Sequence, residues 1–146
     1  MINITKNNRE KYHKEIMKKL SDYSYRSKRY HIDFSITIGF SDKNVDFDEL
    51  INKNRKTDTL IPLEENLCCV VLDCAPTESA IKATSNMQKG FKKLHSDKKL
   101  FTGVVTSKDY DNDKLMVNSL FDVLEYSVAN NMNGLIADVH NMRHSS

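Results

Sequence analysis

The chain has 146 residues and a mass of 16.8 kDa, which is enough for one domain with its own core and too little for two ordinary ones. Hydrophobic residues make up 39% and charged residues 29%, a composition typical of a soluble globular protein that excludes wholesale disorder. The 22 basic and 20 acidic residues are scattered, so the net charge of +2 predicts no nucleic-acid surface. No apolar run approaches the length of a transmembrane helix, and the first residues lack the apolar core of a signal peptide, so no membrane partner is expected.

The cysteines Cys68, Cys69 and Cys74 lie close together in an apolar run. An odd number, two of them adjacent, makes a poor disulfide framework, and their spacing fits no common zinc site. We therefore expect three small buried hydrophobic side chains, no metal site, and a reducing, cytoplasmic setting.

In chain order, the first predicted element is an amphipathic helix over residues 6–28. Its apolar positions recur at helical spacing, and they are Tyr12, Ile16, Leu20 and Tyr23. Over residues 30–40 apolar and polar side chains alternate, which predicts a half-buried strand. A short helix follows over residues 46–55, because Asp46 and Glu49 give it a capping-box-like start.

Two β-prone segments, residues 59–62 and 66–74, predict a hairpin. The second segment is apolar at both parities, which is typical of a central strand covered on both faces. A helix is expected over residues 77–94, with a stripe that consists of Ala80, Ala83, Met87, Phe91 and Leu94. A strand over 100–106, a polar connection, a helix over 115–130 and a short strand over 134–139 complete the order.

This order predicts the α+β class. The expected architecture is a ferredoxin-like βαββαβ core with a central, mostly antiparallel sheet, an N-terminal helix and a C-terminal helix-strand extension. We divide the chain into an N-terminal helix (1–29), an α/β domain (30–140) and a polar tail (141–146) that reads as a frayed end.

Several strings, taken in order, resemble the GGDEF domain of diguanylate cyclases. Residues 26–38 (RSKRYHIDFSITI) are similar to the family's junction between a helix with a basic, aromatic end and the first strand. Arg55 and Asp58 match the family's inhibitory-site motif, Arg-x-x-Asp, in type and placement. Residues 68–88 and 124–136 occupy the places of the apolar strand with its Ala-rich helix and of the closing helix. The likeness covers nearly the whole chain and implies a GGDEF-like fold.

The chain departs from that family at its signature loop, Gly-Gly-Asp/Glu-Glu-Phe. The corresponding residues here are Pro62, Leu63, Glu64, Glu65 and Asn66. Glycines let the backbone approach a nucleotide closely, and Pro62 removes an N–H that could face a phosphate. Glu64 and Glu65 are either remnants of the family's acidic pair or solvated charges at the tip of a hairpin.

Further departures concern metal and phosphate binding. The resemblance places Ile38 or Gly39 where the family has a metal-binding Asp, and the nearest carboxylate is Asp42. Val128 and Met132 stand where the family has phosphate-contacting Lys and Arg. One helix replaces the family's two before the hairpin, and the missing piece normally carries guanine recognition. Because two Mg²⁺ ions need convergent oxygen ligands, we expect no cofactor, no metal site and no cyclase activity.

The resulting functional prediction is a non-catalytic regulatory or sensory module that acts through protein contact. Its N-terminal helix either presents Tyr12, Ile16, Leu20 and Tyr23 to a protein partner or a second copy, or packs this stripe on the domain's own sheet.

The alternative is a receptor for cyclic di-GMP or another nucleotide. Arg55 would bind it bidentately and Asp58 would accept hydrogen bonds from the guanine edge, as the resemblance implies. A structural interpretation competes, in which Arg55 interacts with a helix dipole and Asp58 ends that helix. A residual nucleotide-processing activity has the least support, because the histidines lie in different elements and no P-loop or nucleophile motif occurs.

Overall fold

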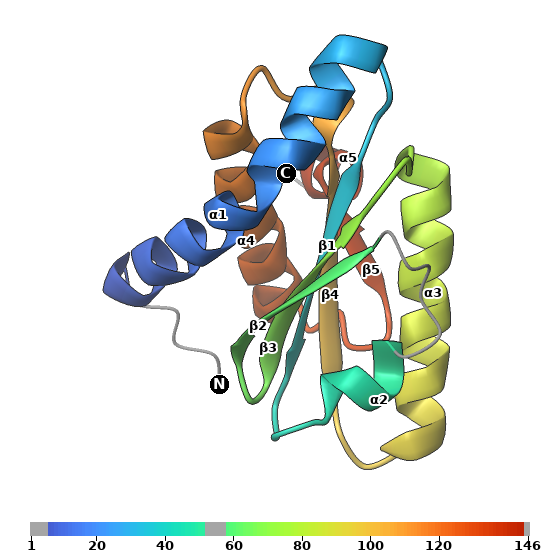
Figure 1. The fold of residues 1–146 in the computed structure, drawn as a ribbon. Helices are drawn as coiled ribbons and strands as arrows, with labels where there is room; N and C mark the ends of the chain where they lie inside the picture. The colour runs from blue at the N-terminus through green and yellow to red at the C-terminus, as the bar shows by residue number, and fades with distance from the viewer. Residues whose placement is uncertain (1–5, 52–57, 145–146) are drawn as a thin grey trace.

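The computed structural model describes residues 6–51 and 58–144, which form a five-stranded sheet with helices on both faces (Figure 1). Its strands are β1 (Ser35–Ser41), β2 (Thr59–Glu64), β3 (Leu67–Leu72), β4 (Leu100–Thr106) and β5 (Ile136–Asp138). They lie in the order β2-β3-β1-β4-β5. All neighbouring strands are antiparallel except β4 and β5. The predicted α+β class, with a βαββαβ core and a C-terminal helix-strand extension, is confirmed.

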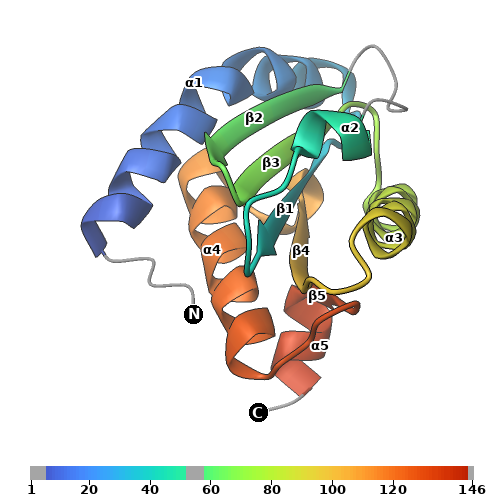
Figure 2. The same ribbon diagram turned by 90° about the horizontal axis from the view of Figure 1, so that it is seen from below.

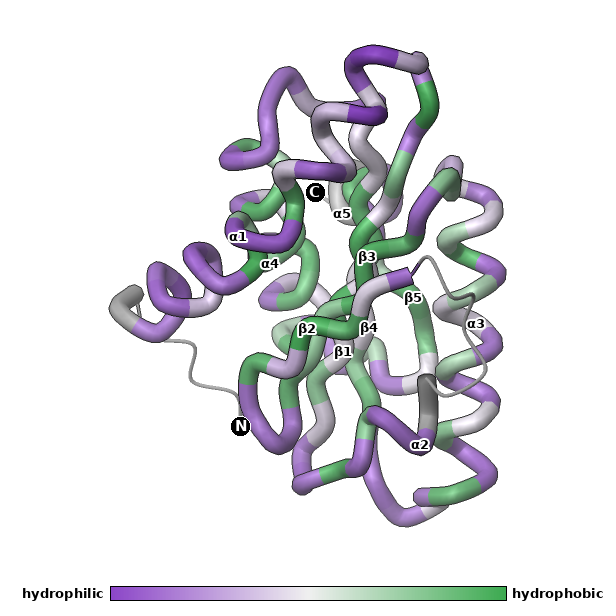
Figure 3. The backbone as a smooth tube through the Cα atoms, in the orientation of Figure 1, coloured by the Kyte–Doolittle hydropathy of each residue, from purple (hydrophilic) through white to green (hydrophobic). Residues whose placement is uncertain are grey.

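The helices are α1 (Lys6–Tyr30), α2 (Phe47–Ile51), α3 (Thr77–Leu94), α4 (Asp113–Ala129) and α5 (Val139–His144), with a 3₁₀ helix at Ser107–Asp109. α1 and α4 cover one face of the sheet, whereas α3 covers the other with α2 beside it (Figure 2). Hydrophobic residues follow the strands, and hydrophilic residues dominate the connections between them (Figure 3).

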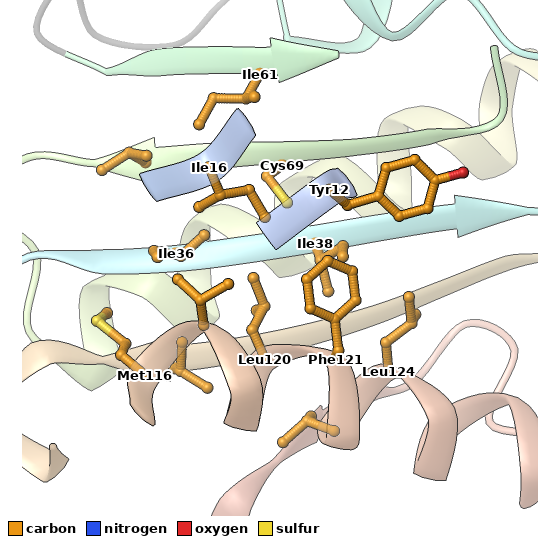
Figure 4. Close-up of a cluster of buried hydrophobic side chains, with 14 of the residues drawn as sticks. Tyr12, Ile16, Ile36, Ile38, Ile61, Cys69, Met116, Leu120, Phe121 and Leu124 are labelled. Atoms are coloured by element: carbon orange, nitrogen blue, oxygen red, sulfur yellow. The ribbon is translucent and has the colours of Figure 1, made fainter. Parts of the chain in front are cut away.

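The core under α1 and α4 is apolar. Ile36 and Ile38 of β1 lie between Ile16 of α1 and two residues of α4, Leu120 and Phe121, and all five are fully buried (Figure 4). Burying a side chain of this size contributes about 1.5–3 kcal/mol relative to leaving it exposed. Hydrophobic burial therefore holds this layer to the sheet.

The face under α3 contains buried polar groups as well as apolar ones. Thr84 Oγ1 of α3 lies 3.0 Å from Thr37 Oγ1 of β1, and both residues are buried. Gln88 Nε2 donates to Thr102 Oγ1 of β4 at 3.0 Å and lies 3.3 Å from the carbonyl oxygen of Leu135, just before β5. Because hydrogen bonds are directional, these contacts fix the position of α3 along the sheet.

The start of β1 differs from the prediction. α1 continues to Tyr30, and His31 has a φ of +56°, a left-handed conformation that commonly ends helices. All residues of β1 are buried, so the interpretation as a half-buried strand is wrong. Its polar positions are covered by α3 and form hydrogen bonds, as the pair of Thr37 and Thr84 illustrates.

Two hydrophobic expectations are also corrected. Leu94, expected in the buried stripe of α3, is exposed, and Thr84 and Gln88 are buried instead. Cys68 and Cys69 are buried as predicted, but Cys74 is exposed because the chain leaves the sheet there with a φ of +51°.

Helix caps explain several boundaries. Asp46 Oδ1 accepts from the Glu49 N–H at 3.4 Å at the start of α2, and Asn112 Oδ1 accepts from the Leu115 N–H at 2.9 Å at the start of α4. The bounds of α3 match the prediction at both ends. The rest of the helix predicted over 46–55 lies outside the described residues after Ile51.

The C-terminal segment is a helix where a frayed polar tail was expected. α5 extends to His144. Asp138 Oδ1 accepts from the Asn141 N–H at 2.8 Å, and Asn141 Oδ1 accepts from the Asp138 N–H at 2.9 Å. This reciprocal cap satisfies two backbone donors at the start of the helix, which explains its formation.

Candidate functional site

The β2–β3 hairpin stands where the resemblance places a nucleotide-binding loop. β2 is the edge strand of the sheet, and its register with β3 shifts between Pro62 and Glu64. Glu65 and Asn66 form the turn, so the predicted hairpin is confirmed. Pro62 lies within β2, where its exposed position on an edge strand tolerates the missing N–H.

The tip of this hairpin is hydrogen-bonded to the connection that follows β1. The Val45 N–H donates to Glu65 O at 3.1 Å, and Asn44 Nδ2 donates to Glu65 Oε2 at 2.6 Å. The Ser41 N–H donates to Asn66 O at 2.9 Å, and Asn66 Nδ2 returns a bond to Ser41 O at 3.1 Å. The polar groups of Glu65 and Asn66 at the hairpin tip are therefore hydrogen-bonded to other residues of the chain.

Glu64 is oriented toward α1. Tyr12 Oη donates to Glu64 Oε1 at 2.9 Å, and Lys11 Nζ lies 3.9 Å from the same oxygen. Burial of the phenol, together with the Glu64 carboxylate beside it, raises the pKa of Tyr12 to about 12. Glu64 therefore serves as an attachment point between the hairpin and the N-terminal helix.

Asp42 is the carboxylate nearest the end of β1, and it contacts neither α1 nor the hairpin tip but the connection before β4. Its Oδ1 accepts from the Lys99 N–H at 2.9 Å, in the connection between α3 and β4. Asp42, Glu64 and Glu65 thus each bind a different part of the chain. Among the described residues, no three His, Cys, Asp or Glu side chains gather as a metal ion would require. These side chains do not fit the pair of Mg²⁺ ions that the resemblance implies.

The surroundings of β1 are apolar where the family would place a metal-binding Asp. Ile38 is fully buried in the core under α1 and α4. On the opposite face, a Cβ at Gly39 would lie 3.6 Å from carbons of Leu100 and Met87 and 3.8 Å from the ring of Phe47. A carboxylate at either position would lose its hydration without gaining a partner there.

Val128 and Met132 stand where the resemblance implies basic residues. Both are partly buried and packed against the core cluster of α1 and α4. Their side chains therefore contribute to the hydrophobic core at the end of α4.

Asp58 of the Arg-x-x-Asp string lies just before β2, and Arg55 lies outside the described residues. Asp58 Oδ1 accepts from the Asp73 N–H at 3.0 Å, which links the start of β2 to the end of β3. Arg26 Nη1 of α1 lies 3.1 Å from the carboxylate of Asp73, and its guanidinium lies 5.0 Å from the centroid of the Tyr23 ring. Nucleotide binding by Arg55 and Asp58 stays a prediction.

The stripe on α1 that we considered for a partner contact is covered by the domain itself. Tyr12, Ile16, Leu20 and Tyr23 are all buried and belong to the same core cluster. The stripe therefore packs on the chain's own sheet and α4, and its interpretation as a partner surface is wrong.

Residues that sequence reasoning missed include Asn44, Arg26 and Asp73. Asn44 holds the hairpin tip, and the ion pair of Arg26 with Asp73 fixes α1 to the end of β3. Each acts across more than 20 positions of sequence. No local periodicity reports such a pairing, so no sequence signal could have found them.

The chain resembles known proteins in its fold and not in its sequence. Neither a protein-family model nor a curated protein sequence matches the chain. Among the described residues, no helix combines the length and apolar character needed to cross a bilayer.

Solved structures of low sequence identity do match. The GGDEF domain of YfiN from Pseudomonas aeruginosa has a TM-score of 0.68 and 12% identity, over 82% of this chain and 90% of that one. The active GGEEF domain of a diguanylate cyclase from Vibrio cholerae has a TM-score of 0.63 and 13% identity, over 80% and 89%. The GGDEF domain of DgcB from Caulobacter crescentus, solved with cyclic di-GMP, has a TM-score of 0.69 and 6% identity, over 86% of each chain. The chain therefore has the fold of a GGDEF domain.

Proposed function

We propose that this chain is a regulatory domain with a GGDEF-like fold that acts through protein contact and makes no cyclic dinucleotide. The observation that carries the proposal is the engagement of the hairpin tip. Glu65 accepts hydrogen bonds from both Asn44 and the Val45 N–H, which brings the connection after β1 against the loop that corresponds to the signature motif.

Phosphoryl transfer depends on positioning and on charge neutralisation by metal ions. The three carboxylates near the hairpin, Asp42, Glu64 and Glu65, bind three different parts of the chain. Drawing them toward a shared metal ion would break at least two of these hydrogen bonds. In addition, Pro62 and Leu63 carry side chains where glycines would let a nucleotide approach the backbone. Both observations support a domain without cyclase chemistry.

The test is a turnover assay with the purified chain, GTP, and either Mg²⁺ or Mn²⁺. We expect no cyclic di-GMP and no pyrophosphate above the buffer blank, while an active diguanylate cyclase in the same buffer produces both. Glu65→Gln serves as the matched variant because it keeps the size of the side chain and removes its charge. Turnover by the natural chain that disappears in Glu65→Gln would contradict the proposal.

A second candidate function is binding of cyclic di-GMP without turnover. The observation that favours it is the fold itself, since the similar GGDEF domain of DgcB was solved in complex with that ligand. Arg55 and Asp58 would be the binding residues. Calorimetry with cyclic di-GMP should give heat for the natural chain and none for Arg55→Ala. Asp58→Asn is the poorer variant, because Asp58 also accepts a hydrogen bond from the Asp73 backbone.

A further inference from the structure

The positive charge of the chain is concentrated in its first helix. Nine of the 22 basic residues and three of the 20 acidic residues lie in α1, so the helix has a formal charge of +6 while the rest of the chain has −4. The small net charge of the whole protein therefore hides one strongly basic element. Such an element attracts anionic partners over a Debye length, which is about 8 Å at physiological salt.

The solvent-facing side of α1 carries much of this charge in one row. We call it the outer row, and it consists of Lys11, Lys14, Lys18, Asp22, Tyr25 and Arg29. All six residues are exposed, and their spacing of three or four positions places them on one side of the helix. That side lies opposite the buried stripe that packs on the sheet and α4, and Figure 2 shows α1 on the outside of the molecule. Four of the six are basic and one is acidic, over a length of about 27 Å.

Ion pairs within the chain neutralise only part of the outer row. Lys18 Nζ lies 3.2 Å from the carboxylate of Glu15 in the same helix, and Lys11 Nζ lies 3.9 Å from that of Glu64. Exposed pairs of this kind contribute little, so an external anion can replace the carboxylate. Lys14 forms no salt bridge with any described residue.

Exposed hydrophobic side chains lie at the C-terminal end of the outer row. Tyr25 is 62% exposed, Tyr30 58% and Ile32 42%, which is half of the six large hydrophobic residues that are exposed in the described chain. Arg29 Nη1 lies 3.4 Å from Tyr25 Oη, and the Arg29 guanidinium carbon lies 5.7 Å from the centroid of the Tyr30 ring. Tyrosines beside basic residues are typical of surfaces that lie at the headgroup level of a bilayer.

The neighbouring connection between β4 and α4 does not alter this balance. Its exposed charges are two of each sign, Lys108 and Lys114 against Asp109 and Asp111. The basic excess on this side of the molecule is therefore that of α1.

We infer that α1 is the surface through which the domain lies on an anionic membrane. The lysines of the outer row would face the lipid phosphates, and Tyr25, Tyr30 and Ile32 would enter the interfacial layer. The contact is peripheral, because α1 keeps its buried stripe on the domain and no membrane-spanning helix is needed. The inference goes beyond the proposed function, since it assigns the domain a location and holds with or without cyclase activity.

A membrane fits this surface better than two other anionic partners. Lysine is depleted at protein–protein interfaces, whereas clusters of about four to eight Lys or Arg residues are typical of attachment to anionic lipids. α1 has seven exposed Lys or Arg residues. Domains that bind nucleic acid commonly have a pI above about 9. This chain has a pI of 8.4 and a negative remainder, and a flat bilayer would meet its basic side alone.

Cosedimentation with lipid vesicles tests the contact. Vesicles of phosphatidylcholine with about 30% phosphatidylglycerol should bind the natural chain, and vesicles of phosphatidylcholine alone should not. Raising NaCl from about 0.1 M to about 0.5 M should weaken binding about tenfold or more, because salt screens the attraction.

Two pairs of substitutions separate the charges from the aromatic rings. Lys14→Gln with Lys18→Gln should weaken binding about tenfold or more, and Lys14→Arg with Lys18→Arg should restore it because the charge is kept. Tyr25→Ser with Tyr30→Ser should weaken binding about threefold or more without changing its salt dependence, since no charge is removed.

A matched control is available on α3. Lys82→Gln with Lys89→Gln changes the net charge by the same amount at exposed positions, and it should leave vesicle binding unchanged. Circular dichroism at equal concentration establishes that every variant is folded.

Four outcomes would overturn the inference: a natural chain that binds neither kind of vesicle or both equally, binding that Lys14→Gln with Lys18→Gln leaves unchanged, an equal loss in the α3 control, or a tyrosine variant that binds like the natural chain. Binding to duplex DNA or to polyglutamate that depends on Lys14 and Lys18, with none to vesicles, would assign the outer row to another polyanion and overturn it as well. The GTP assay contains no lipid, so a failed membrane contact and a failed proposed function are distinguishable.

Discussion

The phenol of Tyr12 donates a 2.9 Å hydrogen bond to Glu64 Oε1, and this contact joins the N-terminal helix to the last residue of β2. It connects residues 52 positions apart. The same bond couples the protonation of a buried phenol to the stability of the β2–β3 hairpin.

Replacing Tyr12 by Phe should remove this coupling. We expect Tyr12→Phe to lower the free energy of unfolding by about 1 kcal/mol at neutral pH, measured by urea titration. The natural chain should also lose stability between pH 10 and about 12, because the unfolded phenol releases its proton near pH 10 while the raised pKa of Tyr12 keeps the native phenol protonated to about 12. Tyr12→Phe should lack this part of the decline. Identical curves for both proteins above pH 10 would contradict the assignment.

Gly103 of β4 permits the close approach of α4. A Cβ at this position would lie 2.9 Å from Val123 Cγ1, so Gly103→Ala should force α4 away from the sheet and cost about 1–3 kcal/mol. Gly39→Ala is the matched control in the neighbouring strand, since its Cβ would meet carbons no closer than 3.6 Å. We expect that variant to be neutral or up to about 1 kcal/mol more stable. Thermal unfolding of the two variants compares them directly, and equal melting temperatures would show that α4 adjusts without cost.

Gln88 should anchor the last strand. Its amide nitrogen lies within 3.4 Å of Leu100 O, Thr102 Oγ1 and Leu135 O, so Gln88→Leu removes these hydrogen bonds from a buried site and should cost about 0.5–1.5 kcal/mol. The Gly134 N–H and Thr102 Oγ1 still donate to the two carbonyl oxygens. Gln88→Glu should cost more, because a carboxylate would then face three oxygen atoms. Hydrogen exchange should accelerate most in β5. A Gln88→Leu protein with natural stability would mean that these hydrogen bonds contribute nothing net.

Asn44 should control the local stability of the hairpin tip. Asn44→Ala removes the 2.6 Å bond to Glu65 Oε2, and we expect faster hydrogen exchange at the Val45 N–H, which donates to the same residue. Global stability should fall by no more than about 1 kcal/mol, because Asn44 is exposed. Lys43→Ala, at the preceding exposed position, is the control. Unchanged protection at Val45 would show that the backbone bond alone fixes the tip.

The cysteines should differ sharply in reactivity. Burial raises the pKa of the Cys68 and Cys69 thiols above the usual range, which suppresses the nucleophilic thiolate, whereas Cys74 is exposed. Mass spectrometry of the native chain after treatment with iodoacetamide at pH 8 should therefore find one adduct, and all three thiols should react in urea. Cys74→Ser should give no native adduct. Rapid labelling of Cys68 in the folded chain would contradict the described burial.

Strong local signals made much of the fold predictable from sequence. Pro76 and the helical period that follows it define α3, and the unbroken apolar run through Val70 and Val71 identifies β3 as a central strand. The period along α1 correctly identified a buried face. It could not report what covers that face, because periodicity measures burial and carries no information about the partner.

The misses have physical causes. Thr84 and Gln88 are polar by composition yet buried, because they find hydrogen-bond partners on β1 and β4 that only the tertiary fold supplies. At the site, the sequence revealed that Gly-Gly is absent, but the bonds between Asn44, Val45 and Glu65 depend on two loops meeting in space. The residue identities thus show that glycines suited to a close nucleotide contact are missing from this loop. They do not show which contacts within the chain the loop makes in their place.

The unlike faces of the sheet give the sequence unequal freedom to vary. Under α1 and α4, one aliphatic side chain can substitute for another at little cost when the total volume is kept. Under α3, replacing Thr37, Thr84 or Gln88 by an apolar residue removes a hydrogen bond from the interior. A randomised library restricted to apolar residues should therefore yield many folded members when it targets the first face and few when it targets the second.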